Sequence, residues 1–492
     1  MLNILENFIA IANNLLWTYV LIVMLLGLGI FFTIKNDFVQ FRYFGEMFRT
    51  LVDKVDKKTK AISPFQAFCI SAASRVGTGS LAGVAIAISL GGPGAVFWMW
   101  VITLIGAASS FVESTLAQVY KVKDKAGYRG GPAYYMERGL NQRGMGIVFS
   151  ILIIVSFGFI FNSVQANTIA YSFENSFREI GLTRFHMGII LTILTTVIIF
   201  GGVHRVAKAS EVIVPVMGVA YIAVATFVIF KNITLIPNML KIIVEGAFGI
   251  RAIATGGLGV VVMQGIKRGL FSNEAGMGSA PNAAAAASTQ HPVKQGFIQT
   301  LGVFTTTLLI CSATAFIIIL SDCYTKDGLG GIQLTQEALR TQVGGWGPHF
   351  ITLCILLFAY SSIIGNYYYG ETNIEFMSKG DKKSTLFLYR IVVLGMVMFG
   401  SVADAQIVWN LADLFMGTMA VINLIAIFRL SPIATACLKD YTRQKKLGLN
   451  PVFNVNSLPN KKGVECWSEH GEIPNDYSSD VETSEKEKVE IV

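Results

Sequence analysis

The residues best suited to chemistry in this chain lie in two glycine-rich segments, each set inside an apolar run. In the first segment, Thr78 stands between Gly77 and Gly79. Glycine lowers helix stability and permits non-helical backbone angles, so this triplet predicts an unwound turn. A bilayer core holds no water to pair with free backbone groups, so such a turn survives only under a cover of protein or beside a water-filled cavity. The first segment therefore predicts a buried break in a helix.

The second segment begins at Lys267 and ends at Asn282. Its glycines and proline alternate with hydroxyl, amide and carboxyl side chains: Gly269, Gly276, Gly278 and Pro281, with Ser272, Asn273, Glu274 and Ser279. At an unwound turn, free N–H groups suit a carboxylate and freed carbonyl groups suit a monovalent cation. The alternative is that the glycines only permit close packing between helices. The polar residues in both segments favour a site for a zwitterion and a cation.

Further polar groups lie inside apolar runs. Gln165 could hydrogen-bond a substrate or bridge two helices. The adjacent hydroxyls of Ser361 and Ser362, with backbone carbonyls, would make a hard-oxygen shell for a monovalent cation, although serine in a membrane helix more often bonds to its own helix. Charged residues inside a span are expensive and need partners or water; these are Arg75, Glu113, Arg268, Glu274, Glu371 and Asp413. Glu274 could cap freed N–H groups, pair with an arginine or carry a proton, and the first two roles are favoured.

The composition places these residues in a membrane. Of the 492 residues, 53% are hydrophobic and only 14% are charged, and the mean hydropathy is +0.57. Such a chain is too apolar for an ordinary soluble protein. Runs long enough to cross hydrocarbon as helices lie near 16–33, 64–90, 95–120, 147–172, 186–202, 211–230, 253–288, 297–320, 348–376, 385–401 and 405–430. With basic loops inside, these eleven spans place the N-terminus outside and the C-terminus in the cytoplasm.

The two glycine-rich segments resemble each other. Aligning Arg75 with Arg268 also aligns Ala82–Gly83 with Ala275–Gly276. The segments lie in the second and seventh predicted spans, and this odd offset sends them in opposite directions across the membrane, as in an inverted repeat. Four regions are expected: an extra N-terminal span with a basic cytoplasmic loop (1–62), two five-helix repeats (63–232 and 233–430), and a partly disordered cytoplasmic tail (431–492).

Other classes of protein are disfavoured. The net charge is +8, but the basic residues lie mostly in alternate short loops. This pattern is typical of a membrane protein rather than of a nucleic-acid-binding protein. The six cysteines are scattered and the five histidines follow no ligand pattern, so neither a disulfide framework nor a resident metal is expected. No nucleophile, base and orienting group form a catalytic set, so an enzyme is not expected. A channel would need a continuous polar pore rather than a site in mid-membrane.

Four runs of sequence resemble the alanine or glycine:cation symporter family. They are Gly77-Thr78-Gly79, Gly91 to Trp100, Arg129 to Met136 and Phe271 to Asn282. The resemblance extends from about residue 61 to about residue 455, and the last run is highly specific. It implies an all-α, leucine-transporter-like 5+5 inverted repeat with one extra N-terminal helix, and sodium-driven uptake of alanine, glycine or both across a prokaryotic plasma membrane. Proton coupling through Glu274 or Glu113 is the alternative. The simplest expected state is a monomer without a cofactor other than the coupling ion.

The resemblance also implies a set of site residues. By similarity, the substrate would contact Thr78, Gly79, Gln165, Phe271 and Ser272. A sodium ion would be held by backbone carbonyls near Ala73, Val76 and Phe358 and by the hydroxyls of Ser361 and Ser362. Two positions depart from the family pattern. Ser80 stands where Asn is usual, and Asn366 stands where many members carry Trp, so Asn366 is counted among the expected substrate-binding residues.

Overall fold

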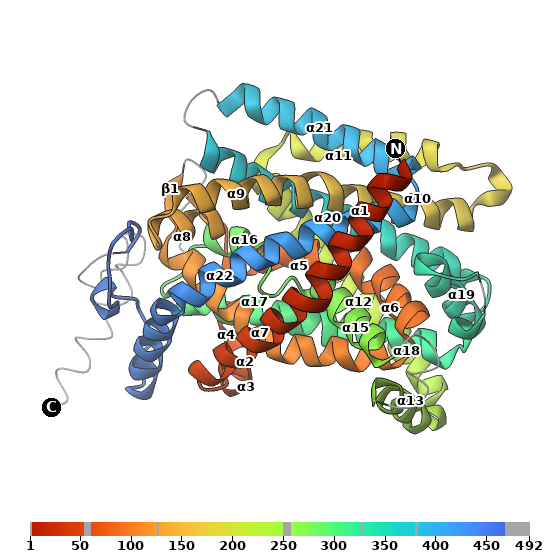
Figure 1. Cartoon of the computed structure of the whole chain (residues 1–492), viewed down its shortest axis with the longest axis horizontal. Coiled ribbons are helices and arrows are strands. Elements are labelled where there is room, and N and C mark those ends of the chain that lie inside the picture. The colour runs from red at the N-terminus through yellow and green to blue at the C-terminus, as the bar shows by residue number, and fades with distance from the viewer. Residues whose placement is uncertain are drawn as a thin grey trace.

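The computed structural model of the chain describes residues 2–53, 61–124, 127–248, 257–326, 328–378 and 382–467. Within these residues the fold is helical apart from one antiparallel hairpin between β1 (Val122–Asp124) and β2 (Gly127–Arg129). Most of the long helices run along the long axis of the molecule (Figure 1). They pack around one large apolar core that draws residues from nearly every helix.

The helices of the first part of the chain, with η marking π-helical or 3-10 turns, are α1 (Leu2–Leu15), η1 (Leu16–Leu21), α2 (Ile22–Lys35), α3 (Val39–Arg42), α4 (Phe44–Leu51), α5 (Pro64–Arg75), η2 (Gly79–Gly83), α6 (Val84–Gly91), α7 (Gly94–Val119), α8 (Pro132–Arg138), α9 (Arg143–Ile153), η3 (Ile154–Phe161), α10 (Asn162–Ser176), η4 (Arg178–Ile180), α11 (Arg184–Ile199) and α12 (Gly202–Lys231). Those that follow are η5 (Ile233–Leu235), α13 (Ile236–Phe248), α15 (Leu258–Asn273), α16 (Pro281–Ala286), α17 (Pro292–Phe304), η6 (Thr305–Cys311), α18 (Ser312–Leu320), η7 (Cys323–Thr325), α19 (Gly331–Val343), α20 (Trp346–Met377), α21 (Lys382–Val402), α22 (Ala405–Lys446) and η8 (Val455–Ser457).

Eight helices within the described residues are long and apolar enough to cross a membrane. They cover Glu6–Lys35, Gly94–Val119, Arg143–Ser176, Arg205–Lys231, Pro292–Leu320, Trp346–Met377, Lys383–Val402 and Ala405–Lys446. The bent pair Pro64–Arg75 and Gly79–Gly91 makes a ninth crossing if it is one span. The two other predicted spans fall on α11, a shorter apolar helix, and on α15 with α16, which follow residues 249–256 outside the described part. The chain is thus an all-helical multi-pass membrane protein, and the count of eleven stays a prediction.

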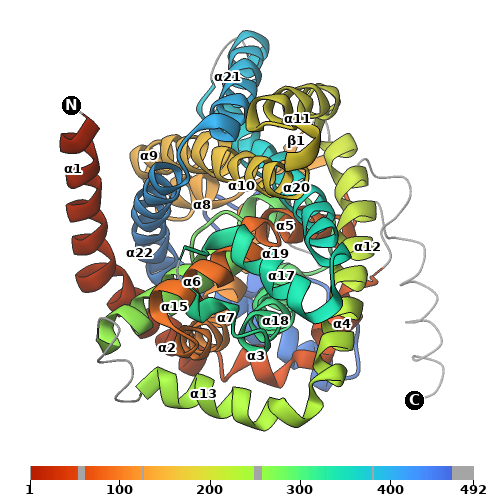
Figure 2. The ribbon, with the colours of Figure 1, turned by 90° about the vertical axis from the view of Figure 1, so that its right-hand side faces the viewer.

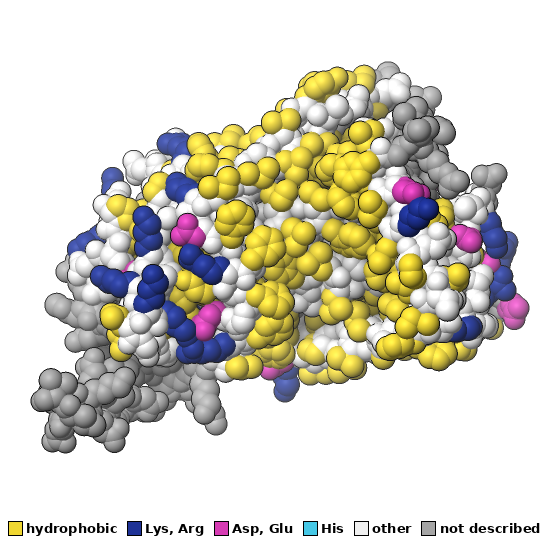
Figure 3. Space-filling model, turned by 90° about the horizontal axis from the view of Figure 1, so that it is seen from below, with side chains coloured by type: hydrophobic (Ala, Val, Ile, Leu, Met, Phe, Trp, Pro, Cys, Tyr) yellow, Lys and Arg dark blue, Asp and Glu magenta, His cyan; other side chains and the backbone are white. Residues whose placement is uncertain are grey.

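The outer surface has the distribution of side chains that a bilayer requires. Figure 3 shows a band of hydrophobic side chains across the middle of one face, with most charged side chains toward the two ends. Large apolar side chains on the outer helices are exposed, including Val197, Val219 and Phe230, which are 62%, 72% and 66% exposed. In a membrane, lipid tails would cover them.

The first span lies at the side of the bundle. Helices α1, η1 and α2 follow one another along α22 and α7. Figure 1 shows α1 crossing in front of the bundle, and Figure 2, turned by 90°, shows it at the edge of the molecule. Trp17 Nε1 donates to the backbone oxygen of Asp413 at 3.2 Å, and Asn13 Nδ2 donates to that of Asn410 at 2.9 Å. These bonds attach the span to the last long helix rather than to its sequence neighbours.

The last helix continues past the predicted end of the final span at residue 430 and reaches Lys446. The chain then folds back over the same end of the bundle, where Phe453 N donates to Gln290 O and Trp467 Nε1 donates to Gln118 O, both at 2.9 Å. Lys121 lies next to this segment, with its Nζ 4.7 Å from the ring centre of Trp467, and burial lowers the pKa of Lys121 to about 7. The part of the predicted tail up to Trp467 is therefore docked, and residues 468–492 lie outside the described residues.

Candidate substrate and cation site

The first break lies where the sequence predicts it. Helix α5 starts with a capping box between Ser63 and Gln66 and ends at Arg75, and the helical stretches on either side of the break, Pro64–Arg75 and Gly79–Gly91, differ in direction by 49°. Both Thr78 and Gly79 are fully buried, so the irregular backbone is covered by protein as the bilayer requires.

The second break starts later than predicted. Phe271 and Ser272 belong to the last turn of α15, and the helix ends at Asn273 rather than near residue 271. The backbone then takes positive φ angles at Glu274 (55°), Gly276 (82°) and Gly278 (84°) before α16 begins at Pro281. Glycine adopts such angles without the steric penalty of a Cβ atom, which explains its use at two of the three positions.

A carboxylate from another helix caps this second break. Glu113 Oε1 accepts the N–H of Gly276 and Oε2 accepts that of Gly278, both at 3.1 Å. The Nδ2 of Asn423 also donates to Oε2, at 2.8 Å, and to the carbonyl of Gly276, at 2.9 Å. Of the roles expected for Glu274, a cap or an ion pair, the cap at these two donors belongs to Glu113 instead. These donors are not free to bind the carboxylate of a substrate.

Glu274 instead links the second break to the first. Its Oε1 accepts from Ser74 Oγ at 2.7 Å, and its Oε2 accepts from Ser279 Oγ at 2.5 Å. Ser74 Oγ also lies 2.7 Å from Asn366 Oδ1 on α20. Asn366 thus belongs to this buried polar bridge, and among the described residues no hydrogen bond joins it to Thr78 or Phe271.

Oxygen atoms of α5 and α20 gather beside the first break. Ser362 Oγ donates to the carbonyl of Ala73 at 2.6 Å and to that of Phe358 at 3.0 Å, and Ser361 Oγ donates to Phe358 O at 2.8 Å. Four of the five residues predicted to hold sodium are thus brought together. The fifth, Val76, is the C-cap of α5, and within the described residues no hydrogen bond joins it to Ser361 or Ser362.

The predicted substrate residues meet at the same place. Gln165 Oε1 accepts the Thr78 N–H at 2.9 Å, while Thr78 Oγ1 is buried with no hydrogen-bond partner in the described part of the chain. A Cβ atom on Gly77 would overlap both Gln165 Oε1 and Ser362 Oγ. The amide from α10 and the hydroxyl from α20 therefore approach the unwound backbone from two sides.

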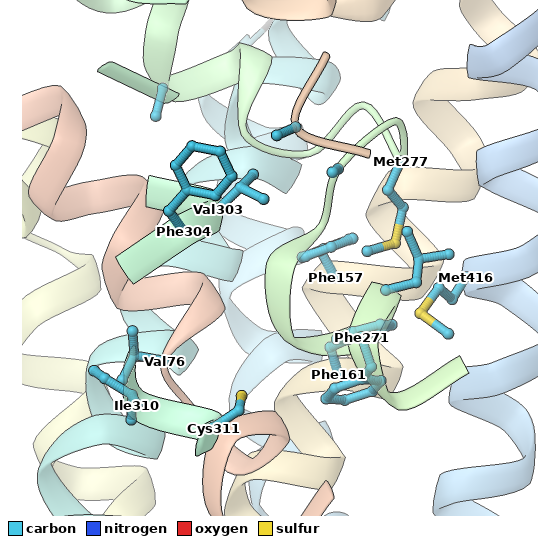
Figure 4. Close-up of a cluster of buried hydrophobic side chains, with 14 of the residues drawn as sticks. Val76, Phe157, Phe161, Phe271, Met277, Val303, Phe304, Ile310, Cys311 and Met416 are labelled. Atoms are coloured by element: carbon cyan, nitrogen blue, oxygen red, sulfur yellow. The ribbon is translucent and has the colours of Figure 1, made fainter. Parts of the chain in front are cut away.

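An aromatic cluster joins the two breaks. A Cβ on Gly79 would lie 2.9 Å from Phe271 Cδ1 and 3.2 Å from Ser272 Cα, so only glycine permits this approach. Phe271 stacks on Phe161 at 4.7 Å with ring planes 10° apart, and its ring centre lies 4.9 Å from that of Trp409. Figure 4 shows Phe271 lying against Phe161, with Met416 close by. These rings give the site an apolar wall.

Small polar groups lie on another side of Ser272. Its Oγ is 3.2 Å from Ser80 Oγ and 3.0 Å from Cys311 Sγ. Thr314 Oγ1 donates to the carbonyl of Ser80 at 2.7 Å. Ser80, a position that departs from the family pattern, therefore joins the first break directly to the second through a hydroxyl pair.

The buried charges of Arg268 and Asp413 pair with each other, as expected of charged residues inside a span. Arg268 Nη2 lies 2.6 Å from Asp413 Oδ2, and Lys267 Nζ lies 3.2 Å from the same oxygen. The Arg268 guanidinium is 4.8 Å from the ring centre of Trp409, which in turn contacts Phe271. The ion pairs of Asp413 with Lys267 and Arg268 therefore lie next to the aromatic cluster.

Reasoning from the sequence missed several residues of this region. Phe161, Trp409 and Cys311 carried no signal, because each is one apolar residue within a long apolar run. Glu113 was recognised as a buried charge that needs partners, but nothing local connects it with Gly276, which lies 163 positions away. Pairings of this kind depend on helix packing, which the sequence does not show.

These features define a class of protein. A multi-pass helical bundle with two interruptions, both buried and lined by polar groups, is typical of secondary transporters, which bind small solutes and ions in mid-membrane. The chain belongs to the sodium:alanine symporter family, whose profile matches residues 2–455. It is therefore a cation-coupled amino-acid symporter and not an enzyme.

Named relatives agree with this assignment. The chain is 59% identical to the probable sodium/glutamine symporter GlnT of Bacillus subtilis (strain 168) over 95% of this chain and 97% of the relative. It is 54% identical to the amino-acid carrier protein AlsT of the same organism over 94% and 98% of the two chains. A manganese transporter mutant of Eremococcus coleocola aligns at a TM-score of 0.46 and 12% identity over 81% and 86% of the two chains, a level that does not establish a shared fold.

Proposed function

We propose that this chain carries alanine, glycine or both into the cell together with sodium, by alternating access around the two breaks. One observation carries the proposal most directly. The unwound backbone at Thr78 and Gly79 touches Phe271 and Ser272 on one side and lies beside the Ser362 oxygen cluster on the other. An amino acid and a cation would therefore bind within one connected set of contacts.

The second break cannot supply the carboxylate donors, because Glu113 occupies them. We therefore assign the substrate carboxylate to the first break, where the unpartnered Thr78 hydroxyl is buried. Gln165 positions that backbone through its bond to the Thr78 N–H. The Phe271 ring limits the space on the apolar side of the site, so this side accepts a substrate with a small side chain.

The coupling ion is assigned to the oxygen cluster of Ala73, Phe358, Ser361 and Ser362. Hydroxyls and carbonyls are the hard ligands that a small cation prefers, and their present hydrogen bonds hold four oxygens within reach of one another. Val76 would complete the shell through its carbonyl. One sodium ion crossing about 100 mV with a tenfold gradient releases roughly 3.7 kcal/mol, enough for several-hundred-fold accumulation of a neutral substrate.

The wider architecture forms part of this proposal. Breaks in the second and seventh predicted spans support a leucine-transporter-like 5+5 inverted repeat with an added first helix. The protein would lie in a prokaryotic inner membrane, with its N-terminus outside and its C-terminus in the cytoplasm. The docked segment 447–467 would then cover the cytoplasmic end.

Two specific observations favour other candidate functions, one with a different substrate and one with a different coupling ion. The relative that is 59% identical bears the name of a glutamine symporter, and the hydroxyl groups of Ser80 and Ser272 could hold an amide side chain. Separately, Ser74 Oγ has one hydrogen but faces an oxygen of both Glu274 and Asn366. Either the Asn366 amide is turned, since its Nδ2 has no hydrogen-bond partner among the residues that the structure describes, or Glu274 carries a proton. The second arrangement would permit proton coupling.

Uptake into vesicles separates these candidates. The purified full chain is reconstituted and given labelled alanine, glycine or glutamine, with sodium and proton gradients imposed one at a time and empty vesicles as the control. The proposal predicts concentrative alanine or glycine uptake with a sodium gradient at equal pH. Accumulation driven by protons in the absence of sodium would contradict the choice of ion. Sodium-driven uptake of glutamine alone would contradict the choice of substrate.

A further inference from the structure

A basic hollow lies between the end of α2 and the end of α22, away from the transport site. Its cations are Lys35, Arg42, Lys439, Arg443 and Lys446, and the only carboxylate among its lining residues is Asp37. Arg42 lies 3.4 Å from Asp37, and Arg443 lies 2.6 Å from Asp440. The three lysines have no carboxylate within ion-pair distance in the described part of the chain. The hollow therefore holds an uncompensated positive charge.

The wall of this hollow is built by a strained turn. Asp37 and Phe38 are consecutive non-glycine residues with positive φ angles of 51° and 54°. The turn is held by the bond from Phe38 N to Thr33 O at 2.8 Å. A second bond, from Thr435 Oγ1 to Asn36 Oδ1 at 2.9 Å, ties it to α22. Backbone strain of this kind persists only where surrounding contacts fix it, and here it sets Lys35 and Arg42 around one hollow.

Exposed phenylalanines follow in the chain just after Asp37, one of the residues that line the hollow. Phe38, Phe41, Phe44 and Phe48 are 54%, 50%, 49% and 51% exposed. Phe38 directly precedes the short helix α3, Phe41 lies on α3, and Phe44 and Phe48 lie on α4. Because these helices follow the apolar run of α2, we expect the four rings where the hydrocarbon core meets the headgroups. Figure 3 shows Lys and Arg side chains gathered at one end of the hydrophobic band. An occupant of this place needs an anionic head and an apolar tail.

We propose that the basic hollow binds the phosphate headgroup of an anionic phospholipid, whose acyl chains lie against the exposed phenylalanines. Basic pockets between membrane helices at the cytoplasmic side suit such headgroups, and each lysine or arginine near the surface strengthens the attraction. The lipid holds the ends of α2 and α22 together. Soluble phosphate shares the headgroup chemistry but has no acyl chains to lie against the exposed phenylalanines, so the lipid is the occupant.

The test measures lipid binding by the purified full chain in neutral detergent, using native mass spectrometry. The protein is titrated with phosphatidylglycerol and with phosphatidylcholine of the same acyl chains, and then with glycerol 3-phosphate as a competitor. We expect phosphatidylglycerol to bind at least about tenfold more tightly than phosphatidylcholine, and glycerol 3-phosphate not to displace it.

The pocket variant is Lys439→Gln with Lys446→Gln, and the matched control is Lys461→Gln with Lys462→Gln, which removes the same charge from the neighbouring C-terminal segment. Loss of two pocket lysines should weaken phosphatidylglycerol binding about 30-fold, while the control stays within about threefold of the wild type. An unchanged unfolding temperature in detergent shows that the pocket variant is folded. Equal lipid affinity in the two variants, or displacement by glycerol 3-phosphate, would overturn the proposal.

Discussion

Replacing Glu113 by Gln tests how the second break is held. The carboxylate accepts from Gly276 N, Gly278 N and Asn423 Nδ2. An amide has one oxygen, so at best it accepts the two donors that now meet Oε2 and turns its NH2 group toward the N–H of Gly276. At least one buried donor is left unpartnered, and the remaining bonds lose their charge. The expected destabilisation is about 2–4 kcal/mol.

Two measurements check this prediction. The unfolding temperature of the purified variant should fall well below that of the wild type, and sodium-driven alanine uptake per folded molecule should also fall. The matched control is Glu371→Gln, which removes a second buried carboxylate from a predicted span. The ion pair of Glu371 with Arg390 is longer, at 3.5 Å, so the control should be milder. If Glu113 were instead a proton carrier, glutamine would mimic its protonated form, and the variant would keep wild-type stability and still exchange alanine across the membrane. That result would refute the capping role.

Three further predictions follow from the same contacts. Ser362→Ala removes one oxygen from the proposed cation shell and should raise the sodium concentration for half-maximal uptake about tenfold at unchanged expression; an unchanged sodium response would remove Ser362 from the site. Gly79→Ala places a methyl group 2.9 Å from Phe271 Cδ1, so uptake should fall more than about tenfold while the protein still folds, and wild-type uptake would disprove the contact. Burial lowers the pKa of Lys121 to about 7. When the segment 447–467 is released, Lys121 is less buried and its pKa is higher, so docking of this segment should strengthen as pH rises from 7 to 9. Trypsin cleavage after Lys446, normalised to denatured protein at each pH, should slow over that range, and constant cleavage would contradict the link.

The sequence predicted the two breaks because their cause is local. Glycine beside polar residues in an apolar run is enough to indicate unwound backbone, and the run around Thr78 was placed correctly. The second break was placed about three residues early. The α15 helix continues through Phe271 and Ser272 because its last turn packs against the first break and the aromatic cluster, and this support is not visible in the local pattern.

Contacts between distant helices explain what the sequence could not show. Glu113 and Asn423 come from α7 and α22, and only the packed structure shows that they meet at the second break. The position of Asn366 has the same origin, since α20 directs it to Ser74 rather than to Thr78. The extension of α22 to Lys446 was missed because the helix leaves the apolar run and becomes polar, a change that ends a predicted span but not a helix.

The central claim is that the two breaks bind an amino acid and sodium together. Equilibrium binding of labelled alanine to the purified full chain tests it most directly, measured in sodium and in choline at the same ionic strength. The account predicts that saturating sodium tightens alanine binding at least about tenfold, and that alanine tightens sodium binding by the same factor, because coupling between two ligands is reciprocal. Alanine binding of equal affinity in sodium and in choline would contradict it.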